Sequence, residues 1–139
     1  MDDAYNETVY AELAYYTLSH PDKEYFIHQH LVDAYLAQFA DEKTKEIAII
    51  FSLVGLYLFS ELGYTGKEVQ LAHMKLSKNK VVWPKIVLPL KRGGFNIHDI
   101  LQSAPGREKD ELIKSWANFV WNAYHESHES IRILVKGIL

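Results

Sequence analysis

The chain has 139 residues, of which 48% are hydrophobic and 24% charged, with a formal net charge of −3 at pH 7. This balance is typical of a globular protein that can bury a sizeable core, and the mildly acidic charge gives no electrostatic reason to expect nucleic acid as a partner. The absence of cysteine excludes disulfides, thiolate metal ligands and a cysteine nucleophile.

The N-terminus and the most apolar segment both indicate a protein outside the membrane. Asp2 and Asp3 stand where a secretory signal would carry basic residues, so we expect a cytoplasmic location. Residues 47–59 are apolar apart from Ser52 and Gly55, but these 13 residues fall short of the roughly 20 that a bilayer requires. We therefore expect a helix buried in the core and no membrane partner.

The first half of the chain predicts four helices separated by capping and turn residues. They span about residues 7–19, 23–40, 44–62 and 65–78. Pro21 ends the first helix, Asp22 is the expected N-cap of the second, and Gly63 is the expected left-handed C-cap of the third. Thr65 and Glu68 form a capping box, which starts the fourth helix.

The segment 79–95 predicts an irregular crossover. Pro84, Pro89 and the glycine pair at 93–94 prevent a regular helix across it. The segment is nevertheless rich in valine, isoleucine and leucine, so we expect an ordered connector, with a short strand as one option. We expect Trp83 to pack on the helices.

The rest of the chain predicts two more helices, over about residues 96–103 and 109–135, with a turn at Pro105 between them. The sequence thus predicts one all-α domain over residues 1–139. Its simplest architecture is a bundle of five or six helices with an irregular crossover around residues 79–95.

The candidate chemistry lies in three of the seven histidines. At 100° per residue, His30 and His73 fall on the apolar faces of the second and fourth helices, and His128 lies at the edge of the apolar stripe on the last. Because a buried imidazole needs a partner, this pattern predicts a shared polar pocket, whether or not a divalent metal such as zinc or nickel fills it. The alternative is that each histidine bonds a nearby tyrosine, glutamine or backbone carbonyl.

Three further side chains are expected to line a ligand pocket, namely Tyr35, Gln38 and Tyr124. In a metal site, Tyr35 or Gln38 would orient a ligand or a bound water. The sequence lacks the local signatures of zinc metalloproteases, P-loop nucleotide-binding proteins and serine hydrolases, so we assign no catalytic residue.

Several short motifs resemble, in order and spacing, those of a family of uncharacterised prokaryotic domains of unknown function. The motifs occupy residues 28–38 (HQHLVDAYLAQ), 72–74 (AHM), 83–84 (WP), 92–93 (RG) and 116–123, within a match over about residues 18–132. The resemblance implies no activity, but it places the histidines of the family on His30, His73 and His128. Phe39 stands where members often carry a further histidine. A looser similarity, in architecture and histidine count, is to DinB-like helical bundles, which hold a divalent metal on three histidines and include thiol-dependent transferases.

Two interpretations of function follow. The favoured one is a non-catalytic module, with a histidine-lined polar pocket that takes a small-molecule ligand or shapes an interaction. The alternative is a divalent-metal-dependent hydrolase or transferase, in which His30, His73 and His128 hold the metal as a Lewis acid. Neither interpretation names a substrate or an oligomeric state.

Overall fold

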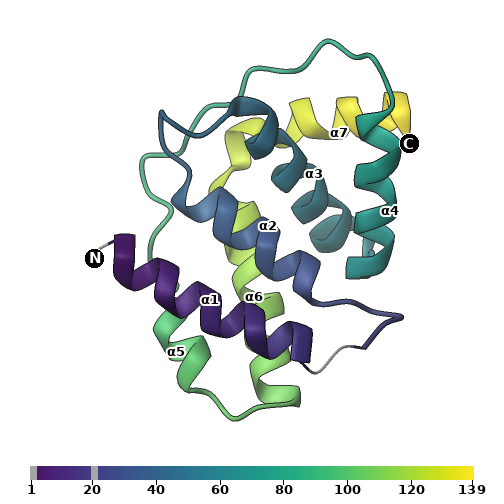
Figure 1. The fold of residues 1–139 in the computed structure, drawn as a ribbon. Coiled ribbons are helices and arrows are strands. Elements are labelled where there is room, and N and C mark those ends of the chain that lie inside the picture. Colours follow the sequence, from purple (N-terminus) through teal and green to yellow (C-terminus); the bar gives the residue numbers. More distant parts are fainter. Residues whose placement is uncertain (1–2, 20–21) are drawn as a thin grey trace.

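The protein folds as seven α-helices and one short 3-10 helix in a computed structural model that describes residues 3–19 and 22–139 (Figure 1). The elements are α1 (Asp3–Ser19), α2 (His28–Phe39), α3 (Glu46–Leu62), α4 (Gly66–Ser77), α5 (Ile97–Gln102), α6 (Arg107–Ala123), η1 (His125–Ser127) and α7 (His128–Ile138). The predicted all-α bundle is confirmed. Pro21, the expected end of the first helix, lies outside the described residues.

The second helix starts later than predicted. The carboxylate of Asp22 accepts hydrogen bonds from the backbone N–H groups of Glu24 and Tyr25, at 3.1 and 3.2 Å, within a turn rather than at a helix start. Phe26 then adopts a φ of 58°, a left-handed conformation that interrupts any helix. The prediction of a helix from residue 23 was therefore wrong, and α2 begins at His28.

The end of α3 and the start of α4 follow local signals in the sequence. Gly63 has a φ of 73°, and its N–H donates to the Phe59 carbonyl at 3.1 Å. Thr65 and Glu68 form the predicted capping box. Both predictions are confirmed, because caps depend on residues only a few positions apart.

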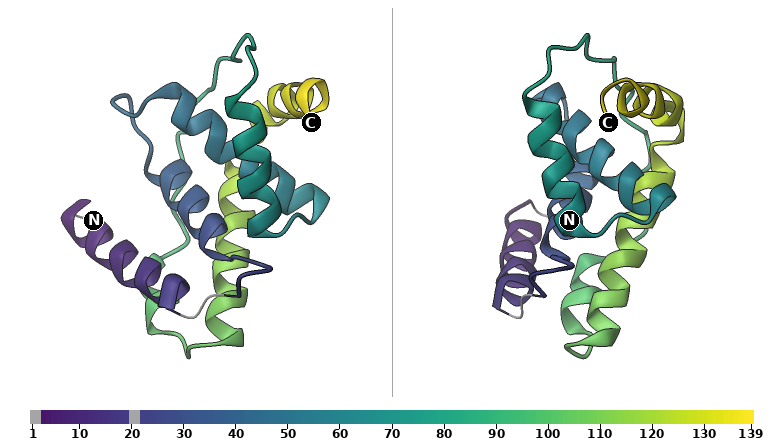
Figure 2. Two further views of the ribbon diagram at one scale, coloured as in Figure 1. Left: turned by 45° about the vertical axis from the view of Figure 1, so that its right-hand side comes forward. Right: turned by 90° about the vertical axis from the view of Figure 1, so that its right-hand side faces the viewer.

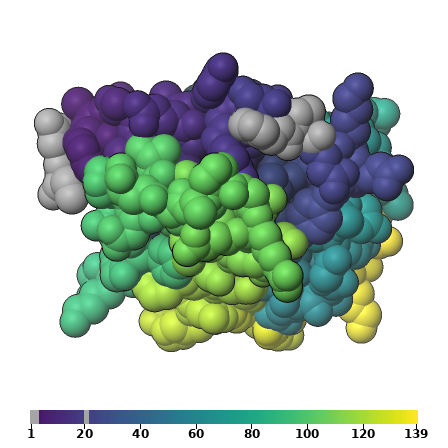
Figure 3. Space-filling view, turned by 90° about the horizontal axis from the view of Figure 1, so that it is seen from below, coloured from purple at the N-terminus to yellow at the C-terminus, as the bar shows by residue number. Residues whose placement is uncertain are grey.

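Three helices form the centre of the bundle. α2, α3 and α6 pack against one another, α1 and α5 adjoin α2 and α6, and α4 and α7 pack on α3 (Figures 1 and 2). Seen from below, α1 and the α5–α6 region lie side by side (Figure 3). Most of segment 47–59 is buried in the core, although Ile47 at its start is exposed. No helix within the described ranges combines the length and apolar composition needed to cross a bilayer.

The crossover between α4 and α5 is irregular, as predicted, and residues 79–95 contain no strand. The backbone N–H of Ile86 donates to the Glu46 carboxylate at 3.2 Å, which ties the crossover to the start of α3. Trp83 is half-buried, with its ring centroid 5.9 Å from that of Phe51 on α3. Burial alternates along part of the segment, so that some of its apolar side chains face the core and others face solvent.

The predicted long last helix is interrupted. α6 ends at Ala123, Tyr124 leaves the helical region with a φ of −91° and a ψ of 31°, and α7 runs across the upper end of α6 (Figures 1 and 2). The Tyr124 hydroxyl donates to the Ala37 carbonyl at the end of α2, at 2.6 Å. The expectation of one helix over residues 109–135 was therefore wrong. The tertiary bond of Tyr124 helps to hold the interruption, and no proline or glycine marks it in the sequence.

Candidate functional site

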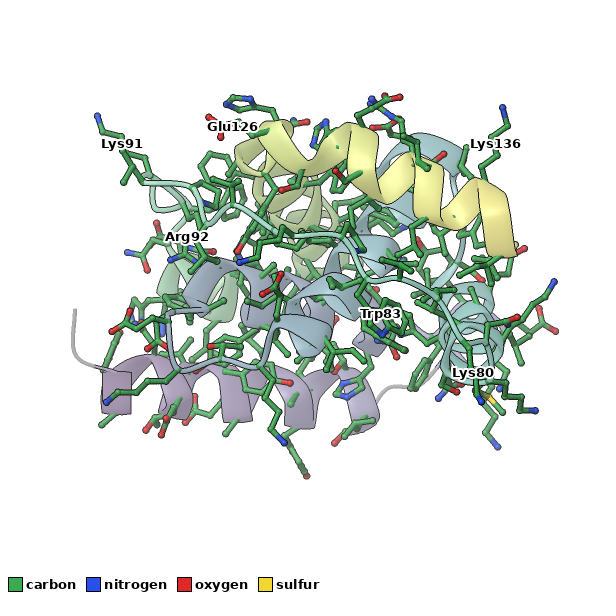
Figure 4. The ribbon with its side chains drawn as sticks, turned by 90° about the horizontal axis from the view of Figure 1, so that it is seen from above. Lys80, Trp83, Lys91, Arg92, Glu126 and Lys136 are labelled. Carbon is green, nitrogen blue, oxygen red and sulfur yellow. The ribbon has the colours of Figure 1, made fainter. Side chains whose placement is uncertain are left out.

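The break between α6 and α7 lies beside a cavity of about 390 Å³ under the crossover. The cavity is lined by four crossover residues, Val87, Pro89, Leu90 and Lys91, and by four residues at the break, Ala123, Tyr124, His125 and Glu126. Figure 4 shows Lys91 and Glu126 projecting from these two segments on the same side of the molecule. The volume of the cavity is at the lower end of the range found for small-molecule sites.

Tyr124 and Arg92 fix the inner side of this region. Arg92 Nη1 donates to the Tyr124 hydroxyl and to the Ala37 carbonyl, both at 3.2 Å. A cation is favourable there, because the last carbonyls of α2 carry partial negative charge. Burial raises the pKa of Tyr124, so the phenol keeps its proton and its bond to Ala37. These contacts hold the end of the crossover against α2 and α6.

The cavity walls divide into an apolar side and a charged edge. Val87, Pro89 and Leu90 supply aliphatic surface from the crossover. Lys91 and Glu126 contribute charges of opposite sign, and neither takes part in an ion pair among the described residues. Such a site can surround the apolar part of a small molecule and offer charge to its polar part.

The three predicted histidines lie outside this cavity, and each has a different partner. His30 Nε2 shares a hydrogen bond with the Tyr25 hydroxyl at 3.2 Å. Nε2 of His73 donates to the Phe51 carbonyl, and Nε2 of His128 to the Trp121 carbonyl, both at 2.7 Å.

These hydrogen bonds agree with the alternative given from the sequence, in which each histidine bonds a nearby tyrosine, glutamine or backbone carbonyl. Within residues 3–19 and 22–139, no three histidine, aspartate or glutamate side chains are grouped to hold a metal ion. The geometry therefore lends no support to a metal site on His30, His73 and His128.

Burial keeps two of these imidazoles neutral at pH 7. It lowers the pKa of His30 to about 3, and the positive charge of Lys114 acts in the same direction. Burial also lowers the pKa of His73, although its bond to the Phe51 carbonyl opposes the shift. The ring of His128 instead stacks on Trp121, with centroids 3.8 Å apart and planes inclined by 10°. The contacts of all three rings are those of packed structural side chains.

Asp33 is a buried acid that phase analysis of the histidines did not single out. Its Oδ1 accepts from Gln29 Nε2 at 3.1 Å, whereas Oδ2 has no partner and lies against the backbone of Gly55 on α3. Burial raises the pKa of Asp33 well above its ordinary value. Nδ1 of His30, one turn earlier on α2, is also buried without a partner. Asp33 follows His30 by three residues and falls at the margin of the apolar stripe of this helix, which was its signal in the sequence.

Only one of the three predicted ligand-pocket residues lines the cavity, and that is Tyr124. The ring of Tyr35 stacks on Tyr10, with centroids 4.0 Å apart. The side chain of Gln38 accepts a hydrogen bond from the Trp116 indole and donates to the Phe95 carbonyl. The structure thus places Tyr35 and Gln38 in contacts of their own, away from the cavity lining.

His125 lines the cavity and is exposed to solvent, which is the direction that its phase on a continuous last helix also predicts. That phase assumed a continuous helix, whereas the helix is interrupted at Tyr124. The polar run over residues 125–130 is the one feature of the sequence that indicates a break in this helix.

Comparison with known families matches residues 7–125 to DUF5946, a family of unknown function, and the chain belongs to that family. The match contains the crossover and all of α6, and therefore most of the cavity lining. No curated protein and no solved structure matches the chain. The predicted resemblance to a family of unknown function is confirmed, and the similarity to DinB-like bundles stays a prediction.

Proposed function

We propose that the protein is a non-catalytic binding module for a small amphipathic molecule, held in the cavity between the crossover and the α6–α7 break. The observation that carries the proposal is the cavity of about 390 Å³, with aliphatic walls and charged groups at its edge. Sites for small organic ligands commonly combine mostly apolar walls with a few polar groups that fix orientation.

The exposure of the crossover side chains supports this proposal. Val87 is 54% exposed and Leu90 is fully exposed, although both adjoin the cavity. A ligand with an apolar portion would remove part of this surface from water, which is favourable in proportion to the area covered. Lys91 on one wall and Glu126 on the other would bind its polar portion, so that orientation is set by charge.

The metal-dependent alternative has no comparable observation behind it. His30, His73 and His128 each bond a separate partner, and two of these partners are backbone carbonyls. The proposal therefore does not include a metal-dependent hydrolase or transferase activity.

The test uses 8-anilinonaphthalene-1-sulfonate, a fluorescent probe with apolar rings and one negative charge. We expect a saturable increase in its fluorescence with one site per chain. Ala123→Trp should abolish the increase, because the indole would fill the cavity that Ala123 lines. Ala11→Trp is the matched control, since Ala11 is an exposed alanine on the outer face of α1.

Circular dichroism and thermal unfolding should be measured on both variants to show that each is folded. The proposal is overturned if the wild-type protein shows no saturable binding, or if Ala123→Trp binds the probe as the wild type does. If Ala11→Trp alone abolished probe binding, the probe would bind at α1, where Ala11 lines a shallow depression, and the proposal would be overturned.

A further inference from the structure

The charges of the chain are divided unevenly along its sequence. Residues 69–98 contain no aspartate or glutamate, and they hold six of the 15 lysines and arginines. The six are Lys75, Lys78, Lys80, Lys85, Lys91 and Arg92. Since the whole chain has a net charge of −3, the residues outside this stretch together carry −9. The weak net charge therefore hides a cationic segment within an acidic protein.

None of these cations is neutralised by a carboxylate in the described ranges. The ion pairs there join Lys114 to Glu111, and Arg132 to Glu61 and Glu129. The five lysines of the segment are exposed, and Arg92 turns inward to a carbonyl and a phenol. Lysines that are exposed and unpaired produce a positive potential that attracts anionic partners.

Exposed aliphatic side chains interrupt the same segment. Val82 is 96% exposed and Leu90 fully exposed, the two highest values among the large hydrophobic side chains that the structure describes. The direction of Val82 is fixed, because its neighbours Val81 and Trp83 pack against the core. Figure 4 looks onto this part of the molecule, with Lys80 near the start of the crossover and Lys91 near its end. We call residues 78–91 the crossover face.

We infer that the crossover face is a docking surface for an anionic lipid bilayer. This inference departs from the expectation, drawn from the sequence, that the protein has no membrane partner, because that expectation considered only a spanning helix. Lysines near the negative surface of a membrane contribute to binding one by one, without a defined partner geometry. Aliphatic side chains that project singly, such as Val82 and Leu90, can enter the boundary between headgroups and acyl chains. The acidic remainder of the chain would be repelled from the same surface, so the protein would approach with this face first.

The types of side chain on the crossover face favour lipid over nucleic acid. Surfaces for single-stranded nucleic acid stack bases on aromatic rings and use arginine. Here Trp83 is half-buried against Phe51, Arg92 points inward, and the fully exposed apolar groups are aliphatic. A protein–protein interface has a closely packed, largely apolar core, whereas Val82 and Leu90 are separated along an extended segment.

The experiment measures flotation of the full chain with vesicles of phosphatidylcholine and phosphatidylserine, and with vesicles of phosphatidylcholine alone. We expect binding to the anionic vesicles that weakens as sodium chloride is added. Lys80→Gln should lower partitioning about five-fold, since one lysine near such a surface contributes roughly that factor. The triple variant of Lys78, Lys80 and Lys85 to glutamine should lower it on the order of a hundred-fold.

The matched control replaces Lys23, Lys43 and Lys67 by glutamine, which removes the same charge from exposed positions outside the crossover face. This control should lower partitioning far less than the triple variant of the crossover face. Val82→Ser should also weaken binding while leaving its salt dependence unchanged, because serine removes apolar contact and no charge.

Three results would overturn the inference. The first is equal binding to both kinds of vesicle, and the second is an equal loss in the two triple variants. The third is stronger binding, at the same salt, to an oligodeoxythymidylate or to polyglutamate, which would assign the face to nucleic acid or to an acidic protein. The crossover face shares Leu90 and Lys91 with the proposed ligand site. The substituted residues Lys78, Lys80, Val82 and Lys85 do not line the cavity, so these variants test the two proposals separately. The triple variant should therefore bind the fluorescent probe like the wild type.

Discussion

Two regions of the molecule break the usual rule that polar side chains face water and apolar side chains face the core. The α2–α3 interface buries polar groups, and the crossover face exposes apolar ones. At the interface, His30 and Asp33 are polar groups buried with one atom each unpartnered. On the crossover face, Val82 and Leu90 are apolar groups left in solvent. Buried polar groups influence stability, because they lose hydration on folding. Exposed apolar groups have little influence on folding and are available for binding. The two regions should therefore separate in experiment, one through stability and the other through binding.

The largest effect is expected from acid at His30. Its pKa falls from 6.5 to about 3 on folding, so only the unfolded chain takes up the proton between these values. The stability that depends on neutral His30 is present above pH 6.5 and is lost as pH falls towards 3, by about 5 kcal/mol in total. Urea unfolding between pH 7 and 4 should show this loss.

His30→Gln should flatten the acid dependence, because glutamine does not titrate. His125→Gln is the control, since it makes the same substitution at an exposed histidine. A wild-type stability that is constant between pH 7 and 4 would contradict the buried, neutral state of His30.

The next largest effect is expected at Gly55. A Cβ there would lie 1.9 Å from Asp33 Oδ2 and 3.0 Å from Val69 Cγ1, so Gly55→Ala forces α2, α3 or α4 to move. We expect a loss of about 2–3 kcal/mol in the free energy of unfolding, as for overpacking of a core. Gly137→Ala is the control, because a Cβ on that helical glycine meets nothing within 4 Å, and it should be neutral or slightly stabilising.

Adding Asp33→Ala to Gly55→Ala should recover part of the lost stability, because the shorter side chain removes the closest contact. If Gly55→Ala alone were as stable as the wild type, the close packing of Asp33 on α3 would be disproved.

The sequence predicted those parts of the fold that depend on near neighbours. Gly63 and the Thr65–Glu68 capping box mark helix ends through bonds within a few residues, and both were confirmed. The interruption at Tyr124 escaped prediction because its hydroxyl bonds Ala37, 87 positions away. A long-range contact of this kind overrides helix propensity, and locally the sequence shows only the polar run over residues 125–130.

The candidate site was less predictable than the fold, for a related reason. Helical phase correctly turned His30 inward, where it is fully buried. Phase gives the direction of a side chain around its own helix but not the neighbour that it meets, so it could not show that His30, His73 and His128 bond different partners. The cationic segment can be read from the sequence, but the net charge of −3 averages it with the acidic remainder and does not indicate it.

A smaller effect is expected at Asp33. Its folded pKa is raised, so the folded state holds the proton more tightly than the unfolded chain, and stability falls as pH rises above the ordinary aspartate value of 3.8. Asp33→Asn removes this titration. The variant should be more stable than the wild type at pH 7 by on the order of 1 kcal/mol, the scale of one unsatisfied buried polar group.

The advantage of Asp33→Asn should shrink as pH falls towards 4, which is the reverse of the change caused by His30. Urea unfolding of both proteins at several pH values measures it. If the variant were less stable than the wild type at every pH, the Asp33 carboxyl would stabilise the fold as a hydrogen-bond acceptor, and the expectation would be wrong.

The smallest effect on stability is expected on the crossover face, and it is tested by two adjacent valines. Val82 is 96% exposed, whereas Val81 is half-buried against the core. Val82→Ser should change the free energy of unfolding by less than about 0.5 kcal/mol, as is usual for surface substitutions. Val81→Ser should lower it by about 1 kcal/mol, because it removes packed aliphatic surface. Thermal unfolding and vesicle flotation of the two variants should therefore rank them in opposite order, with Val81→Ser less stable and Val82→Ser weaker in membrane binding. If the same variant were the weaker one in both stability and membrane binding, the buried side of this segment would not be distinct from a binding side.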